Sequence, residues 1–269
     1  MPSRRAEPIP YEELPLGSLR EDRIEALWCY RSAIARRQLV LPDGRMDLVA
    51  RGTLAPSGQL ADIRLALAGP ADRPGFVSTP AATVTLGVRF RIGWGSACLG
   101  LDAASLRNRV AVGRAAEALI GPSAQAMLRA CSVDELRQAL VDTAHAMSLR
   151  AAPPAGHARV LQAVELMRHG VAIGALGERI GMAERTLRRD VDASVGLPLR
   201  TLGGILRFQR TLARLQGEAV RSLGTLAAEA GYSDQAHMTR AFRRFGNFTP
   251  ALPEPAPVVE HIDHHVPWP

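Results

Sequence analysis

The feature that most constrains this chain is a pattern that occurs twice in its C-terminal half, 50 residues apart. The first copy comprises Leu176-Gly177, Gly181-Met182-Ala183 and Leu187, and the second comprises Leu226-Ala227, Gly231-Tyr232-Ser233 and Met238. In each copy a small residue precedes a turn glycine by four positions, and an apolar residue follows. Glycine takes the left-handed conformation that ends a helix, and a small residue lets two helices cross closely. Each copy therefore predicts two short helices joined by a tight turn.

The segments around the two copies also have helical periodicity. We expect short helices at about 173–180, 184–195, 222–230 and 234–245, and a longer connecting helix at about 199–216. One such pattern often arises from helix packing alone. Two copies joined by one helix are more specific and favour a pair of helix-turn-helix units, each presenting its second helix to a DNA major groove.

The stretch from Leu226 to Phe245 resembles the second helix-turn-helix of the AraC/XylS family of transcription regulators almost position for position. The resemblance covers about residues 157–250. It implies two recognition helices on one side of the domain, which enter major-groove segments roughly 34 Å apart. It also implies double-stranded DNA as a partner, with RNA polymerase as a second partner if the protein is an activator.

Some residues depart from the family pattern. Family members usually carry an aromatic residue at the position of Val191 and a small residue, often alanine, at that of Gly177. Gly203 and Gly204 lie inside the connecting helix, where a glycine costs about 1 kcal/mol. We therefore expect the first unit to be looser than the second.

The cationic side chains are all arginine, and they are enriched around the repeat. The net charge is +7, and residues 151–252 carry 14 Arg against 8 Asp and Glu. Surplus arginine on a helical domain indicates a polyanionic partner, although a merely solvated basic surface fits the charge equally well. The absence of lysine excludes P-loop nucleotidases, pyridoxal-phosphate enzymes and protein kinases.

Candidate DNA contacts lie on both predicted recognition helices. On the first, we expect contacts from Arg185, Arg188 and Arg189, unless they pair with Glu184, Asp190 and Asp192 instead. On the second, the face opposite Met238 and Phe242 carries Gln235, Ala236, Thr239, Arg240 and Arg243. Glutamine reads adenine, methyl groups contact thymine, and arginine reads guanine or binds phosphate. Phosphate contacts at most are expected from Arg207, Arg214 and His237.

The first half of the chain has strand character. Short apolar or alternating segments at Gln38–Leu41, Met46–Ala50, Ile63–Ala68 and Thr83–Arg91 are separated by turn signals. They predict a small antiparallel β-barrel or sandwich, and the helical periods that follow make the chain as a whole α+β. In Thr83–Arg91 the alternation predicts a half-buried strand.

The segments at 40–49 and 87–93 resemble a poorly characterised sensor-like domain that often precedes AraC-type DNA-binding domains. The resemblance implies a small jelly-roll-like β-unit followed by helices and identifies no ligand. For a sensing or dimerising domain, a small-molecule effector and a homodimer are the candidate partners. Pro153 and Pro154 mark the best domain boundary. We expect a sensor domain at 1–150, the DNA-binding domain at 151–252 and an extended or disordered tail at 253–269.

The sequence supports an enzymatic function less well than DNA binding. A carboxylate pair at Asp43 and Asp47 suggests acid–base work, but Pro42-Asp43-Gly44 is more simply a turn. Core filling is the better interpretation of Trp28, Tyr30 and Trp94. The tail histidines His261, His264 and His265 lack a rigid frame for a metal. We therefore expect no catalytic residues, metal or cofactor, and we keep a non-specific nucleic-acid-binding protein and a small-molecule enzyme as alternatives.

The remaining composition points to the cytoplasm. The three cysteines are far apart and form no disulfide framework. No run of 18 apolar residues is present, and the first residues lack the apolar segment of a signal peptide. We expect a cytoplasmic protein that does not enter the membrane.

Overall fold

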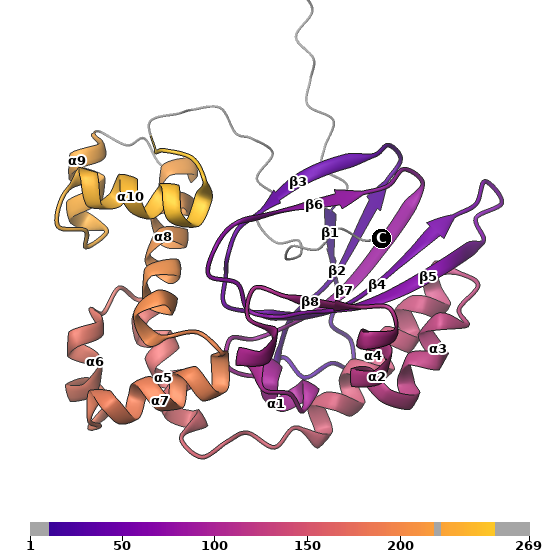
Figure 1. Ribbon diagram of the computed structural model, residues 1–269, viewed down its shortest axis with the longest axis horizontal. Coiled ribbons are helices and arrows are strands. Elements are labelled where there is room, and N and C mark those ends of the chain that lie inside the picture. Colours follow the sequence, from indigo (N-terminus) through magenta and orange to yellow (C-terminus); the bar gives the residue numbers. More distant parts are fainter. Residues whose placement is uncertain (1–10, 218–221, 251–269) are drawn as a thin grey trace, which may run out of the picture.

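The N-terminal half forms two antiparallel sheets with helices on one side (Figure 1). The computed structural model describes residues 11–217 and 222–250. The larger sheet has the order β1-β2-β7-β4-β5-β8, and the smaller sheet pairs β3 with β6. The strands are β1 (Tyr11–Leu14), β2 (Ile24–Ser32), β3 (Arg36–Val40), β4 (Met46–Leu54), β5 (Leu60–Ala68), β6 (Gly75–Thr79), β7 (Thr83–Phe90) and β8 (Val110–Val112). Within the described residues the sheets do not close into a barrel, because β3 and β6 pair only with each other.

One face of the larger sheet packs on helices. Its apolar side chains, among them Leu48, Leu86 and Phe90, form one cluster with Met127 and Leu140 from these helices. The helical elements are α1 (Gly95–Leu99), η1 (Ala103–Leu106), α2 (Arg114–Ile120), η2 (Gly121–Ser123), α3 (Ala124–Leu128) and α4 (Val133–Arg150). None of the helices in the described ranges is long and apolar enough to cross a membrane.

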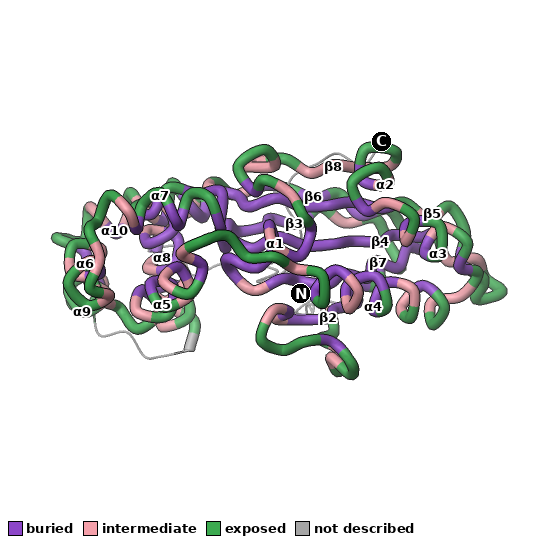
Figure 2. Tube along the Cα trace, turned by 90° about the horizontal axis from the view of Figure 1, so that it is seen from below, coloured by how far each residue is buried: buried purple, intermediate pink, exposed green. Residues whose placement is uncertain are grey.

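The other face of this sheet carries polar side chains, and they too are buried. The expectation that β7 is half-buried is wrong, because every residue of the strand is buried. Arg51 shows the reason: its Nε donates to Thr85 Oγ1 of β7 (3.0 Å), and its Nη1 donates to the Ser78 carbonyl of β6 (3.3 Å). The β3–β6 sheet therefore covers the polar face, and Figure 2 shows the strands as a buried layer.

The C-terminal half is helical, as the sequence predicts. Its helices are α5 (His157–Arg168), α6 (Ile173–Ile180), α7 (Glu184–Val195), α8 (Leu199–Gly217), α9 (Leu223–Glu229) and α10 (Gln235–Gly246). In Figure 1, α8 runs from the α6–α7 pair to the α9–α10 pair. The core of these helices also contains Leu39, Leu41 and Ile92, which the strand region contributes. The two halves are therefore joined by shared apolar packing. The tail at 253–269, with its three histidines, lies outside the described residues.

Candidate nucleic-acid interface

The first helix-turn-helix is formed by α6 and α7. Gly181 takes a left-handed conformation (φ 68°) and ends α6, as the pattern predicts. The amide of the next residue, Met182, donates to the Gly177 carbonyl over 2.8 Å. This bond holds the turn directly against the helix that precedes it.

Gly177 is required by that close approach. A Cβ atom added at this position would lie 2.8 Å from the Met182 backbone oxygen, closer than real Cβ contacts come. The expectation that glycine here loosens the first unit is therefore incomplete. Without a side chain at this position, the Met182 oxygen approaches α6 more closely than a Cβ would allow.

The second unit, formed by α9 and α10, repeats the local geometry. Gly231 is left-handed (φ 78°), and the Tyr232 amide donates to the Ala227 carbonyl over 2.9 Å. This bond matches the Met182–Gly177 bond of the first unit position for position. Asp234 caps α10, because its Oδ1 accepts the His237 amide over 2.6 Å. The sequence repeat therefore corresponds to a structural repeat.

The connecting helix also uses its glycines for close packing. A Cβ at Gly203 would lie 2.7 Å from Ile173 Cδ1, at the start of α6. A Cβ at Gly204 would lie 3.2 Å from the Phe245 ring, near the end of α10. The two adjacent glycines thus let both helix-turn-helix units approach α8, which offsets their unfavourable helix propensity.

Three arginines lie on the solvent side of α7. Arg185, Arg188 and Arg189 are exposed, whereas Leu187 and Val191 are fully buried. Arg188 Nη2 pairs with Glu184 Oε1 at 2.5 Å, and Arg189 Nη2 lies 3.5 Å from Asp190 Oδ1. The alternative of local ion pairs therefore holds for these two side chains in the free protein. The Arg188–Glu184 pair is exposed and worth at most about 1 kcal/mol, so DNA competes with it readily. Asp190 is buried and has a nearer partner in Arg159 at 2.8 Å, which leaves Arg189 available to DNA.

The solvent face of α10 carries the other candidate readers. Gln235, Ala236, Arg240 and Arg243 are exposed. Thr239 is half-buried, and its hydroxyl donates to the Gln235 carbonyl over 2.9 Å. That bond occupies the hydroxyl group and suits Thr239 to contacts through its methyl group.

The three candidate phosphate contacts lie in different environments. The guanidinium of Arg207 lies 5.3 Å from the centre of the Tyr232 ring, in cation–π geometry. Arg214 Nη2 pairs with Glu229 Oε2 at 2.5 Å. His237 meets the Tyr232 ring edge-on, and its Nδ1 lies 3.1 Å from Ser233 Oγ. All three groups help to hold helices together in the free protein.

Two clefts beside the recognition helices bring in residues that sequence reasoning missed. A cleft of about 620 Å³ is lined by Arg188, Arg189, Asp192, Pro198, Leu199 and Arg200. A second, of about 260 Å³, is lined by Ile173, Gly204, Tyr232, His237, Ala241, Phe245 and four arginines: Arg200, Arg207, Arg240 and Arg244. The sequence analysis names Arg207 and Arg240 but misses Arg200 and Arg244. The seven-residue spacing from Arg200 to Arg207, which places both on one helix face, is the signal that would have found Arg200.

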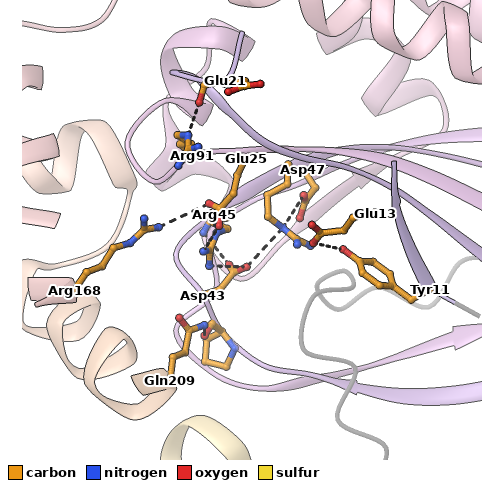
Figure 3. Close-up of polar contacts among 12 residues, drawn as sticks. Tyr11, Glu13, Glu21, Glu25, Asp43, Arg45, Asp47, Arg91, Arg168 and Gln209 are labelled. Atoms are coloured by element: carbon orange, nitrogen blue, oxygen red, sulfur yellow. Dashed lines mark hydrogen bonds and ion pairs between the residues drawn. The ribbon is translucent and has the colours of Figure 1, made fainter. Parts of the chain in front are cut away.

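The N-terminal domain contains a buried network of charged side chains (Figure 3). Arg89 Nε lies 3.3 Å from Asp47 Oδ1 and 3.9 Å from Asp43 Oδ2. Asp43 Oδ1 accepts the Arg45 amide over 2.9 Å, which confirms the predicted turn. Burial raises the pKa of Asp47 to about 6, although the charge of Arg89 opposes the shift. Trp28 and Tyr30 are buried beside this network and fill the core, as expected.

This network continues to the boundary between the two halves. Arg45 binds Glu25 through two hydrogen bonds of 2.5 and 2.7 Å, and Arg168 of α5 lies 3.8 Å from the same carboxylate. Burial raises the pKa of Glu25, but Arg45 and Arg168 hold it below its usual value. Nearby, Gln209 of α8 donates to the Pro42 carbonyl over 3.0 Å (Figure 3). Polar contacts thus connect the sheets to α5 and α8.

Comparison with known families assigns both halves of the chain. Residues 176–251 match the helix-turn-helix domain family, and residues 13–111 match a domain of unknown function, DUF6597. The first match spans both structural repeats, and the second covers most of the strands. No curated protein sequence matches the chain.

Solved structures of ToxT from Vibrio cholerae show a distant likeness. The crystal structure from strain O395 is 10% identical, with a TM-score of 0.39, over 82% of this chain and 94% of that one. The structure of unsaturated fatty acid bound wild-type ToxT from strain SCE256 is 11% identical, with a TM-score of 0.38, over 83% and 91%.

The paired helix-turn-helix units and the family match define a DNA-binding transcription regulator. More specifically, its C-terminal half carries a helix-turn-helix domain of the AraC type, and a DUF6597 domain precedes it.

Proposed function

We propose that this regulator is sequence-specific and reads two major-groove segments of one DNA site, one with each helix-turn-helix unit. The observation that carries the proposal is the repeated turn geometry at the two ends of α8. The matched hydrogen bonds, Met182 to Gly177 and Tyr232 to Ala227, orient each recognition helix in the same way on its own unit. A helix oriented in this way inserts into a major groove.

The proposed readers divide by chemistry. Gln235 suits the edge of an adenine, and the methyl groups of Ala236 and Thr239 suit thymine. Arg185, Arg240 and Arg243 suit guanine or phosphate. Arg188 and Arg189 would leave their carboxylate partners, Glu184 and Asp190, and contact the DNA in the same way. Arg207, Arg214 and His237 are proposed to contact phosphate at most.

A non-specific nucleic-acid-binding protein is the main alternative, and selection of bound DNA from a random library separates the two. We expect the selected sequences to share two short motifs about 10 bp apart. The selected site should keep a large preference over random DNA while both affinities fall with salt. Selected pools without a common motif would support the non-specific protein.

We propose further that the N-terminal domain is the regulatory part of a cytoplasmic protein. It would take a small-molecule effector or form a homodimer, and RNA polymerase would be a partner of the DNA-bound form. The buried polar layer between the sheets and its link to Arg168 support a route from this domain to the DNA-binding helices. Catalysis is not proposed, because Asp43 and Asp47 are both paired with arginines.

A further inference from the structure

We infer that a DNA backbone phosphate binds in the arginine-lined cleft between the two helix-turn-helix units, at Arg200, Arg207, Arg240 and Arg244. The inference rests on the proposed function and adds residues to it. It places a third contact between the two base-reading surfaces, at the part of the DNA site that neither recognition helix enters.

The first argument is charge. The cleft brings four guanidinium groups from α8 and α10 together, and its lining contains no Asp or Glu. Within the described residues, no ion pair involves Arg200 or Arg240, although Asp234, which caps α10, interacts electrostatically with Arg240. Like charges gathered in a hollow raise the local positive potential and attract an anion. By contrast, Arg188 and Arg214 are each paired with a carboxylate at 2.5 Å.

The second argument is position. Arg200 lines both clefts, so it lies between Arg188 and Arg189 of the first recognition helix and Arg240 of the second. The arginines therefore form a continuous path from one recognition helix to the other. A DNA strand that passes from one major-groove segment to the next presents its phosphates along such a path.

The third argument is preorganisation. Arg207 lies over the Tyr232 ring, and Arg244 lies 4.9 Å from the centre of the Phe245 ring. Stacking fixes a guanidinium group before the anion arrives and leaves its N–H groups free to donate. A second carboxylate outside the lining, Asp72, interacts with Arg244. Burial raises the pKa of Asp72, while Arg107, Asn108 and Arg244 together lower it below its usual value. Arg107 pairs with Asp72 at 2.5 Å, so this carboxylate already has a nearer partner.

The test uses the full-length protein, its selected site, and the same site with one neutral methylphosphonate linkage midway between the two motifs. We expect this linkage to weaken wild-type binding by about ten-fold, the size of one charge-assisted hydrogen bond. Arg200→Ala should weaken binding to the unmodified site by about the same factor and lower the slope of log affinity against log salt concentration by about one. The variant should bind the modified and unmodified sites equally well. Arg200→Lys should restore most of the salt slope.

Two controls make the outcome specific. Arg114→Ala removes an exposed arginine from α2 in the N-terminal domain and should leave binding almost unchanged. Circular dichroism should show that each variant is folded. Equal affinity, equal salt slope and equal linkage sensitivity in wild type and Arg200→Ala would overturn the inference. Stabilisation of the free protein by inorganic phosphate that Arg200→Ala abolishes, with DNA binding intact, would assign the cleft to a free anion and also overturn it. A wild type without sequence preference would instead contradict the proposed function.

Discussion

Replacing Gly177 by alanine tests whether the first helix-turn-helix depends on a missing side chain. Gly177 lies inside α6, where alanine is favoured over glycine by up to about 1 kcal/mol. The added Cβ, however, would lie 2.8 Å from the Met182 oxygen, a backbone atom that cannot rotate away. Overpacking of this kind costs about 1–3 kcal/mol. We therefore expect a net loss of roughly 1–2 kcal/mol, with about 2–4 °C of melting temperature for each kcal/mol.

Gly174 in the same helix provides the matched control. A Cβ there meets nothing within 4 Å, so Gly174→Ala should leave stability unchanged or raise it by up to about 1 kcal/mol. Urea unfolding and thermal unfolding measure both variants under one set of conditions. If Gly177→Ala were as stable as Gly174→Ala, the close approach of turn and helix would not exist and this reasoning would be refuted.

Three further predictions concern reading, pH and domain structure. Gln235→Ala should lower the binding free energy on the selected site by about 1–3 kcal/mol and relax the preference at one base pair. Arg214→Ala should instead weaken binding to all sequences equally. An unchanged base preference in Gln235→Ala would show that Gln235 does not read a base. Because the pKa of Asp47 is raised in the folded state, its contribution to stability should fall as pH rises from about 4 to 6. Asp47→Asn should flatten this fall in urea titrations, and an unaltered profile would contradict the assignment. Residues 151–269 should fold alone and bind DNA in mobility shifts, with lower stability than in the full chain because they lose Leu39, Leu41 and Ile92; an unfolded fragment would refute the boundary.

The helices and several strands follow from local sequence signals. The expected bounds 173–180 and 184–195 match α6 and α7, because the glycine that ends α6 and the apolar spacing along both helices are local features. Local sequence signals do not predict the strand at Ile24–Ser32. Its continuous apolar run lacks alternation, since both faces of β2 are covered. The burial of the polar side of β7 also depends on a second sheet that no local pattern announces.

The candidate interface was only partly predictable. The exposed positions of Gln235 and Arg240 follow from helical periodicity, because the opposite face carries the buried Met238. The effect of glycine at position 177 on packing depends on the distance between α6 and the turn that follows it. The cleft at Arg200 depends on how the two helix-turn-helix units pack on α8. Distances of this kind are set by tertiary packing, so the sequence alone did not reveal them.

Hydroxyl-radical footprinting of the full-length protein on its selected site tests the central claim most directly. If both helix-turn-helix units read DNA, the footprint should contain two protected segments about 10 bp apart on one face of the duplex. Protection of one segment alone would contradict the claim that the α6–α7 unit reads DNA. Uniform protection without phasing would contradict sequence-specific recognition by both units.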